Sequence, residues 1–202
     1  MTGHVTAISG EIGTFLLELK HLSHLDLSMN YFEKIPEFIG SLAELTYLNL
    51  SYNPLTGFIP HQLGNLSRLL YLDLNYPHSL RSSNLEWLSH ISTLKLLKIS
   101  HASFEKATNW LQVIQYHPSL SVLHFEYYSL PENLSGCAKD SLESLLLTYN
   151  NFNGSLPSFI PFSSLRELDV GYNQLSGHFE DNFGDFSKLS VVEHGLQCSK
   201  QP

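Results

Sequence analysis

Apolar residues recur along this chain in a short phrase that returns seven times, at spacings of 22 to 26 residues. Three copies are nearly intact, and they read LSHLDLSMNYF from Leu22, LTYLNLSYNPL from Leu45 and LRELDVGYNQL from Leu165. Within each copy the apolar positions 7 and 9 alternate with polar neighbours. Because side chains along a strand point to opposite faces with a period of two, the pattern predicts one short strand per copy. Positions 7 and 9 should enter a core, while positions 6, 8 and 10 should face solvent.

Aligning the copies on the asparagine at position 12 shows how regular the repeat is. Positions 7, 9 and 12 are Leu25, Leu27, Asn30; Leu48, Leu50, Asn53; Leu72, Leu74, Pro77; Leu97, Ile99, Ala102; Leu123, Phe125, Tyr128; Leu145, Leu147, Asn150; and Leu168, Val170, Asn173. Leucines at positions 4, 7 and 9 with this period are the leucine-rich-repeat signature. We therefore expect an α/β repeat solenoid, a curved arc with a parallel β-sheet on its concave face and short helical turns on its convex side.

The asparagines of position 12 have a predicted structural role. A side-chain amide both donates and accepts, so stacked asparagines can form a ladder that satisfies backbone groups in adjoining turns. We predict such a ladder for Asn30, Asn53, Asn150 and Asn173, interrupted where Pro77, Ala102 and Tyr128 replace asparagine.

The middle repeats are longer and predict helical turns on the convex side. The segments NLEWLSHISTL and ATNWLQVIQYHPSL carry Trp87 and Trp110, which we expect to fill the wider space behind the sheet. The alternative is an exposed tryptophan that anchors a partner.

The array has three predicted parts. Residues 1–20 read as a degraded first repeat without a cysteine cap, 21–194 as about seven repeats plus a truncated eighth, and 195–202 as a tail. Neither end shows a polar cap, and uncapped solenoids expose core leucines. We therefore expect marginal stability or self-association.

Composition excludes several functions. The formal net charge is −8 and the eleven Lys and Arg are scattered, whereas nucleic-acid binding needs a basic stripe. No stretch approaches the ~20 apolar residues of a membrane span, and no signal-peptide core follows Met1. The eleven His are dispersed, and HLSH at 21–24 lacks a fitting partner ligand, so we expect no metal or other cofactor. No nucleophile or carboxylate pair has an activating context, so we expect no enzyme.

Two cysteines, Cys137 and Cys198, do not make a disulfide framework. Strand counting separates them by about 12 Å, beyond the ~7 Å limit for bridged Cα atoms, and predicts that they do not pair with each other.

A second phrase follows the strand in three repeats: LTGFIP, FNGSLP and the degraded LSGHFE. Together with NLEWLSHISTL and ATNWLQV, this order resembles the amino-terminal half of plant receptor-like proteins of the disease-resistance type, and among them receptors for the fungal ethylene-inducing xylanase. The resemblance covers nearly the whole chain. It implies a ligand-recognition module in defence signalling, on the extracellular side of the plasma membrane, with a protein or peptide ligand and a co-receptor kinase as partners.

Position 11 supplies the candidate binding residues. It contains Met29, Tyr52, Tyr76, His101, Tyr127, Tyr149 and Tyr172, which should form an aromatic stripe along one edge of the concave sheet. Tyrosine suits recognition because it offers a rigid apolar ring and a hydroxyl. The alternative is that these rings only shield the strand-to-loop turn. Position 8 adds Asp73, His124 and Asp169 to the candidate ligand-binding set, in the column Asp26, Asn49, Asp73, Lys98, His124, Leu146 and Asp169.

Two further features bear on an extracellular setting. N-x-Ser sequons occur at Asn49, Asn65, Asn133 and Asn153; those at Asn65 and Asn133 are predicted in loops, whereas that at Asn49 lies inside a concave strand. His101 and His124 would gain charge near the reference pKa of ~6.5 if they are exposed on the concave face. Exposed histidines without consequence are the alternative.

Other functions remain open from the sequence. A soluble inhibitor of microbial wall-degrading enzymes would use the same concave face, but inhibitors of this type keep both cysteine caps and about ten regular repeats. An ectodomain piece of a receptor kinase and a non-functional fragment are the remaining alternatives.

Overall fold

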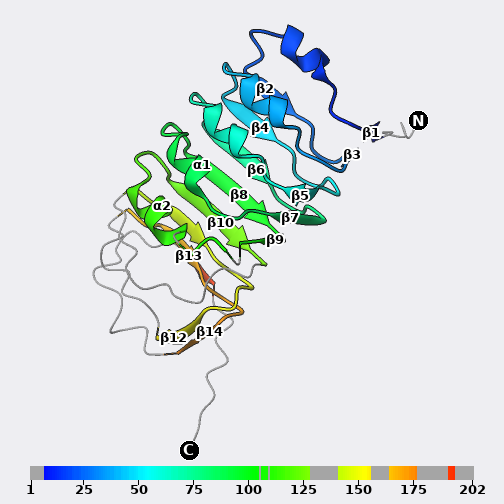
Figure 1. The fold of residues 1–202 in the computed structure, drawn as a ribbon. Helices are drawn as coiled ribbons and strands as arrows, with labels where there is room; N and C mark the ends of the chain where they lie inside the picture. The colour runs from blue at the N-terminus through cyan, green and yellow to red at the C-terminus, as the bar shows by residue number, and fades with distance from the viewer. Residues whose placement is uncertain are drawn as a thin grey trace, which may run out of the picture.

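The chain folds into a ladder of parallel strands that run side by side along a curved array (Figure 1). The computed structural model describes residues 7–104, 106–108, 110–127, 141–155, 164–176 and 191–193. Eight strands form the inner sheet: β2 (His24–Asp26), β4 (Tyr47–Asn49), β6 (Tyr71–Leu74), β8 (Leu96–Ser100), β10 (Val122–Glu126), β11 (Ser144–Leu146), β13 (Glu167–Asp169) and β15 (Val191–Glu193). Their order in the sheet follows their order in the chain, which confirms the predicted solenoid.

Position 7 of each repeat pairs with position 7 of the next. The register joins Leu25 to Leu48, and it continues in the same phase through Leu72, Leu97, Leu123, Leu145 and Leu168. All seven leucines are buried in one continuous core. Burying a leucine side chain stabilises the fold by roughly 1.5–3 kcal/mol, so repetition of this single position is a main source of the array's stability.

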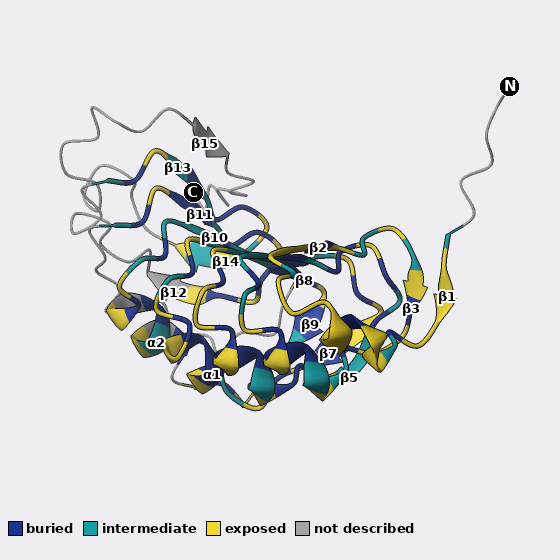
Figure 2. Ribbon diagram, turned by 90° about the horizontal axis from the view of Figure 1, so that it is seen from above, coloured by how far each residue is buried: buried dark blue, intermediate teal, exposed yellow. Residues whose placement is uncertain are grey.

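Short helical turns cover the side of the core opposite the inner sheet (Figure 2). Among the described residues, three are 3-10 helices, η1 (Thr14–Glu18), η2 (Glu37–Ser41) and η3 (His61–Asn65), and two are α-helices, α1 (Glu86–Ser89) and α2 (Trp110–Tyr116). The α-helices occur in the two longer repeats, as predicted. Trp87 and Trp110 are 3% and 2% exposed. They fill the core, so the alternative of an exposed tryptophan anchor is wrong.

A second set of short strands follows the inner strands. Strands β5 (Thr56–Phe58), β7 (Ser79–Arg81) and β9 (Ala102–Ser103) form one parallel sheet, β12 (Asn153–Ser155) pairs with β14 (Gln174–Ser176), and β1 (Ser9–Gly10) pairs with β3 (Tyr31–Phe32). The glycine phrase supplies β5, where Gly57 has a φ of 83° that favours glycine. Strands β7 and β9 lack that phrase, and the sequence analysis did not predict them.

The asparagine ladder is confirmed at its four described rungs. Asn53 is 1% exposed; its Nδ2 donates to the carbonyls of Leu27, Leu50 and Ser51, and its Oδ1 accepts from the amide of Phe32 at 3.0 Å. The side-chain amides of Asn30, Asn150 and Asn173 donate to backbone carbonyls in the same manner. Asn53, Asn150 and Asn173 each donate to three carbonyls, and one of the three belongs to the preceding repeat. The ladder therefore ties each of these turns to the repeat before it.

The ladder gap has its own hydrogen bonding. At the two described replacement positions, Pro77 and Ala102 are buried. There the amide of Tyr76 donates to Ser100 Oγ of the next repeat at 2.8 Å. The outer strands β7 and β9 also pair directly, joining Leu80 to Ala102.

Candidate functional site

The position-11 residues form the predicted aromatic stripe, and their rings are stacked. Ring centroids are 4.4 Å apart for Tyr52 and Tyr76, 4.4 Å for His101 and Tyr127, 4.3 Å for Tyr127 and Tyr149, and 4.0 Å for Tyr149 and Tyr172. Tyr76 and His101 make the loosest step, at 5.5 Å with a tilt of 32°. All six rings are exposed. We call these six residues the edge stack. Because each ring covers the next, the stack presents ring edges and hydroxyls rather than free faces.

Every residue at position 11 has a left-handed backbone conformation. The φ angles of Met29, the five tyrosines and His101 lie between 52° and 60°. A side chain larger than glycine in this region costs roughly 1–2 kcal/mol. Stacking offsets part of this cost, since an aromatic pair contributes about 0.5–1.5 kcal/mol beyond buried area. The edge stack therefore forms at the left-handed strand-to-loop turn, and its part in ligand binding is a proposal.

A shallow depression runs beside the edge stack. It has a volume of about 610 Å³, and four predicted residues line it, namely His101, Tyr127, Tyr149 and Tyr172. Its other wall comes from Ser79 and Leu80 of β7 and from Ala102 and Ser103 of β9. The unpredicted outer strands thus give the stripe a second side.

A second stack lies on the inner sheet, and the sequence analysis missed it. The rings of His24 and Tyr47 are 4.0 Å apart, and those of Tyr47 and Tyr71 are 4.3 Å apart. These residues occupy position 6 of three successive repeats, so reading down that column would have revealed them. His24 is exposed, whereas both tyrosines are half-buried. We call this group the inner stack.

Acidic and amide side chains of position 8 run beside the inner stack. Asn49 Nδ2 donates to Asp26 Oδ2 at 3.2 Å, and the Tyr71 hydroxyl donates to Asp73 Oδ2 at 3.1 Å. Burial raises the pKa of Asp73 despite hydrogen bonds from Asn75 and Tyr71. For Asp26, burial raises the pKa, but hydrogen bonds from Ser28 and Asn49 outweigh it and the pKa is lowered. This part of the inner face combines aromatic rings with acceptor oxygens.

The position-8 side chains also shape the turn that follows each strand. In four repeats the Oδ1 atom at position 8 accepts a hydrogen bond from the backbone amide at position 10, at 2.9 to 3.0 Å. The amide of Ser28 donates to Asp26, that of Ser51 to Asn49, that of Asn75 to Asp73 and that of Gly171 to Asp169. Asp and Asn favour such local turns. The candidate residues Asp73 and Asp169 therefore have a structural role that the sequence analysis did not assign.

The expectation that positions 6, 8 and 10 all face solvent is wrong in part. Ser51, Ser100 and Thr148 at position 10 are buried, and so are Asp73 at position 8 and Ser144 at position 6. Position 10 precedes the left-handed turn, and its small hydroxyls bond locally: Ser51 Oγ donates to Asn49 Oδ1 at 2.8 Å. The solvent-exposed part of the inner face is therefore narrower than the three columns formed by positions 6, 8 and 10.

His124 is not the exposed, readily charged histidine that the sequence suggested. It is half-buried on β10, and its Nε2 lies 3.2 Å from Ser144 Oγ. Burial, followed by the charge of Lys98, lowers its pKa to about 4, against the attraction of Glu167. His101, by contrast, is exposed within the edge stack. His124 therefore stays neutral across the range in which a charge change was predicted.

This lowered pKa predicts a pH-dependent stability. As the pH falls below 6.5 the unfolded chain protonates His124, whereas the folded chain resists until about 4, so stability present above pH 6.5 is lost toward pH 4. Over this pH range we expect the free energy of unfolding of His124→Gln to fall by about 1–2 kcal/mol less than that of the parent chain. This figure allows for solvent screening. Urea unfolding at several pH values measures the difference, and parallel curves would contradict it.

The sequons fall in different settings. Asn49 lies on inner strand β4, as predicted, with its amide hydrogen-bonded to Asp26. Asn65 is exposed but is the last residue of η3 rather than a loop residue, because a 3-10 turn forms there. Asn153 begins β12 and is exposed. Asn133, Cys137 and Cys198 lie outside the described residues.

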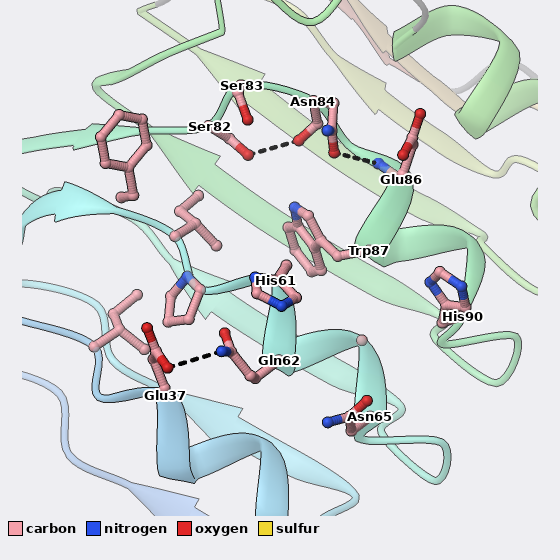
Figure 3. Close-up of a pocket in the computed structure, with 15 residues that line it drawn as sticks. Glu37, His61, Gln62, Asn65, Ser82, Ser83, Asn84, Glu86, Trp87 and His90 are labelled. Carbon is pink, nitrogen blue, oxygen red and sulfur yellow. Dashed lines mark hydrogen bonds between the residues drawn. The ribbon is translucent and has the colours of Figure 1, made fainter.

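A polar hollow of about 650 Å³ lies on the helical side of the array, among η3, α1 and the outer strands (Figure 3). Gln62 Nε2 donates to Glu37 Oε2 at 2.8 Å across one wall. On another wall Ser82 Oγ donates to the carbonyl of Asn84, whose Oδ1 accepts from the amide of Glu86. The hollow shares no residue with the edge stack or the inner stack.

The described residues contain no group of three or more His, Cys, Asp or Glu placed to hold a metal ion. None of the helices that the structure describes has the length and apolar character to cross a membrane.

Known proteins that resemble this chain in sequence or in structure are leucine-rich-repeat proteins. A family model described as a leucine-rich repeat region matches residues 2–201. Receptor-like proteins EIX1 and EIX2 of Solanum lycopersicum are 40% and 39% identical over 198 residues, covering 93% of this chain and 19% of each relative. The solved ectodomain of the Arabidopsis thaliana membrane receptor kinase GASSHO1/SCHENGEN3, in complex with CASPARIAN STRIP INTEGRITY FACTOR 2, is 32% identical with a TM-score of 0.63, covering 84% of this chain and 20% of that one. This chain spans about a fifth of the length of these proteins.

Proposed function

Since this chain belongs to the leucine-rich-repeat proteins of the plant receptor-like class, we propose that it supplies part of the ligand-recognition surface of a cell-surface receptor in defence signalling. The observation that carries the proposal is the inner stack, where the exposed ring of His24, the half-buried rings of Tyr47 and Tyr71, and the acceptor oxygens of position 8 lie together on the sheet. The inner-stack side chains lie outside the leucine core, so they can contribute to specificity without being part of it.

The geometry favours a protein or peptide ligand. The inner stack extends over three repeats, the position-8 column over seven and the edge stack over six. A surface of this length suits an extended segment better than a small molecule, which prefers an enclosed pocket. The acidic ends of position 8, at Asp26 and Asp169, favour a segment with basic residues near its ends.

In this proposal the chain binds and does not catalyse. The carboxylates of Asp26, Asp73 and Asp169 accept from local backbone amides, so they serve the turns rather than an activated nucleophile. Placement on the extracellular side of the plasma membrane and partnership with a co-receptor kinase are parts of the same proposal. The receptor-like relatives support them over a soluble inhibitor of wall-degrading enzymes.

The proposal is tested with the fungal ethylene-inducing xylanase as the probe, immobilised on a biosensor and exposed to the full chain. We expect saturable binding that the double substitution Tyr47→Ala and Tyr71→Ala weakens by about tenfold or more, since buried aromatic residues dominate interface energies. The matched control is Tyr116→Ala, because Tyr116 is an exposed tyrosine on α2, on the helical side of the array.

Two results would contradict this proposal. One is binding that survives the inner-face double substitution while the variant melts as the parent chain does. The other is an equal loss on substituting Tyr116, which would place the contact on the helical side. Absence of any binding would exclude this xylanase as the ligand.

A further inference from the structure

The edge stack brings tyrosine rings from neighbouring repeats into near-parallel contact at an exposed surface. Tyr149 and Tyr172 stack at 4.0 Å and Tyr127 and Tyr149 at 4.3 Å, each with an interplanar angle of 8°. Tyr52 and Tyr76 stack at 4.4 Å and 17°. The exposed fractions of these five tyrosines run from 40% to 61%. His101 separates them into a run of three and a run of two.

Their exposure and spacing together distinguish these residues from the other tyrosines that the structure describes. The inner-stack residues Tyr47 and Tyr71 are half-buried, and the Tyr71 hydroxyl is bonded to Asp73. Tyr31 is as exposed as Tyr172, at 61%, and Tyr116 is more exposed, at 77%, but both lie outside the two stacks. The edge stack therefore combines solvent access with a second phenol held alongside.

We propose that the edge stack is a site of oxidative tyrosine cross-linking between neighbouring repeats, driven by hydrogen peroxide and a haem peroxidase. Each phenol loses one electron and one proton, leaving a phenoxyl radical shared between its oxygen and its ortho carbons. Two such radicals join through one ortho carbon each, and each of these carbons then passes its hydrogen to the oxygen as the ring regains aromaticity. The pair loses two hydrogen atoms in all, and one hydrogen peroxide is reduced to two waters.

The fold favours coupling within the chain over coupling between chains. Register in the inner sheet fixes position 11 of each repeat beside position 11 of the next, which gives the second radical a high effective concentration. The tyrosines stand at an exposed turn, so the rotation from stacking to the edge-to-edge approach that the bond requires takes place toward solvent and not into the core. The product links two consecutive repeats covalently. It goes beyond ligand recognition and needs no ligand.

The test is oxidation of the full chain at low concentration with a haem peroxidase and limiting hydrogen peroxide. We expect dityrosine fluorescence from the monomer, loss of two hydrogen atoms per link in the intact mass, and cross-linked peptides that join Tyr127 to Tyr149, Tyr149 to Tyr172, or Tyr52 to Tyr76. Because a link closes a loop that the unfolded chain otherwise leaves open, the oxidised monomer should melt several degrees higher.

Phenylalanine variants assign the sites, since phenylalanine keeps the ring but cannot form the radical. Tyr149→Phe should remove the peptides of the run of three and lower the fluorescence by about half, because the Tyr52 and Tyr76 pair remains. Combining it with Tyr76→Phe should lower the fluorescence to background. Tyr31→Phe and Tyr116→Phe are the matched controls and should leave it unchanged. Links that form mainly between chains, that map to Tyr31 or Tyr116, or that persist in the double variant would overturn the proposal.

Discussion

Replacing Asn53 by alanine is expected to lower the free energy of unfolding by about 3 kcal/mol. The side chain is 1% exposed and makes three donor contacts and one acceptor contact with the backbone. Alanine would leave the amide of Phe32 and the carbonyl of Leu50 without these bonds in the interior, and each buried unsatisfied group costs about 1–3 kcal/mol. Urea unfolding followed by circular dichroism measures the loss.

Asn30→Ala is the matched control for this prediction. Asn30 is a rung of the same ladder, but it is half-buried, with two donor contacts and one exposed acceptor contact from the amide of Ile8, so water can replace part of what is lost. We expect a loss of about 1 kcal/mol. Equal losses at Asn30 and Asn53 would show that burial of the ladder does not set its contribution to stability.

Gly40→Ala should destabilise the chain by about 3 kcal/mol, although alanine is the better helix former by about 1 kcal/mol. A β-carbon at Gly40 in η2 would lie 2.1 Å from the carbonyl oxygen of Gln62 and 2.6 Å from its carbonyl carbon in η3. Backbone atoms cannot rotate away, so the two turns would have to separate and open the core around Ile39 and Leu63. Thermal melting measures the effect.

The corresponding glycine of the next turn provides the control. At Gly64 the nearest atom to an added β-carbon is the carbonyl oxygen of Trp87, at 3.0 Å, which a shift of a few tenths of an ångström relieves. We expect Gly64→Ala to cost about 1 kcal/mol or less, because its helix propensity partly offsets the contact. A neutral Gly40→Ala would show that η2 and η3 do not pack as closely as described.

The repeating part of the fold could be predicted because each repeat follows one rule. Leucine spacing gave the strand register from Leu25 to Leu168, and position 12 predicted the ladder through Asn53 and Asn150. The greater length of the middle repeats predicted both α-helices and the burial of their tryptophans. These features arise because the same position of successive repeats stacks in register. Aligning the repeats of this one chain with each other is enough to reveal them.

The site could be predicted only in outline. The edge stack follows from its column, but the left-handed backbone at Tyr52 or Tyr172 does not, because tyrosine seldom adopts that conformation. The lowered pKa of His124 depends on its burial and on charges from other strands, Lys98 on adjacent β8 and Glu167 on β13, more than twenty residues away in the sequence. Position 10 was misassigned because the alternation of a strand ends where the turn begins.

The order of strands in the inner sheet has a consequence for how the chain opens. Each inner strand pairs with inner strands from adjacent repeats, so a segment can be released from one end while the others keep their partners. Amide exchange should therefore be slow at β8 and β10 and progressively faster outward to β2, with fraying that precedes complete denaturation. Such a gradient would make one melting temperature an average over several local openings rather than a single event.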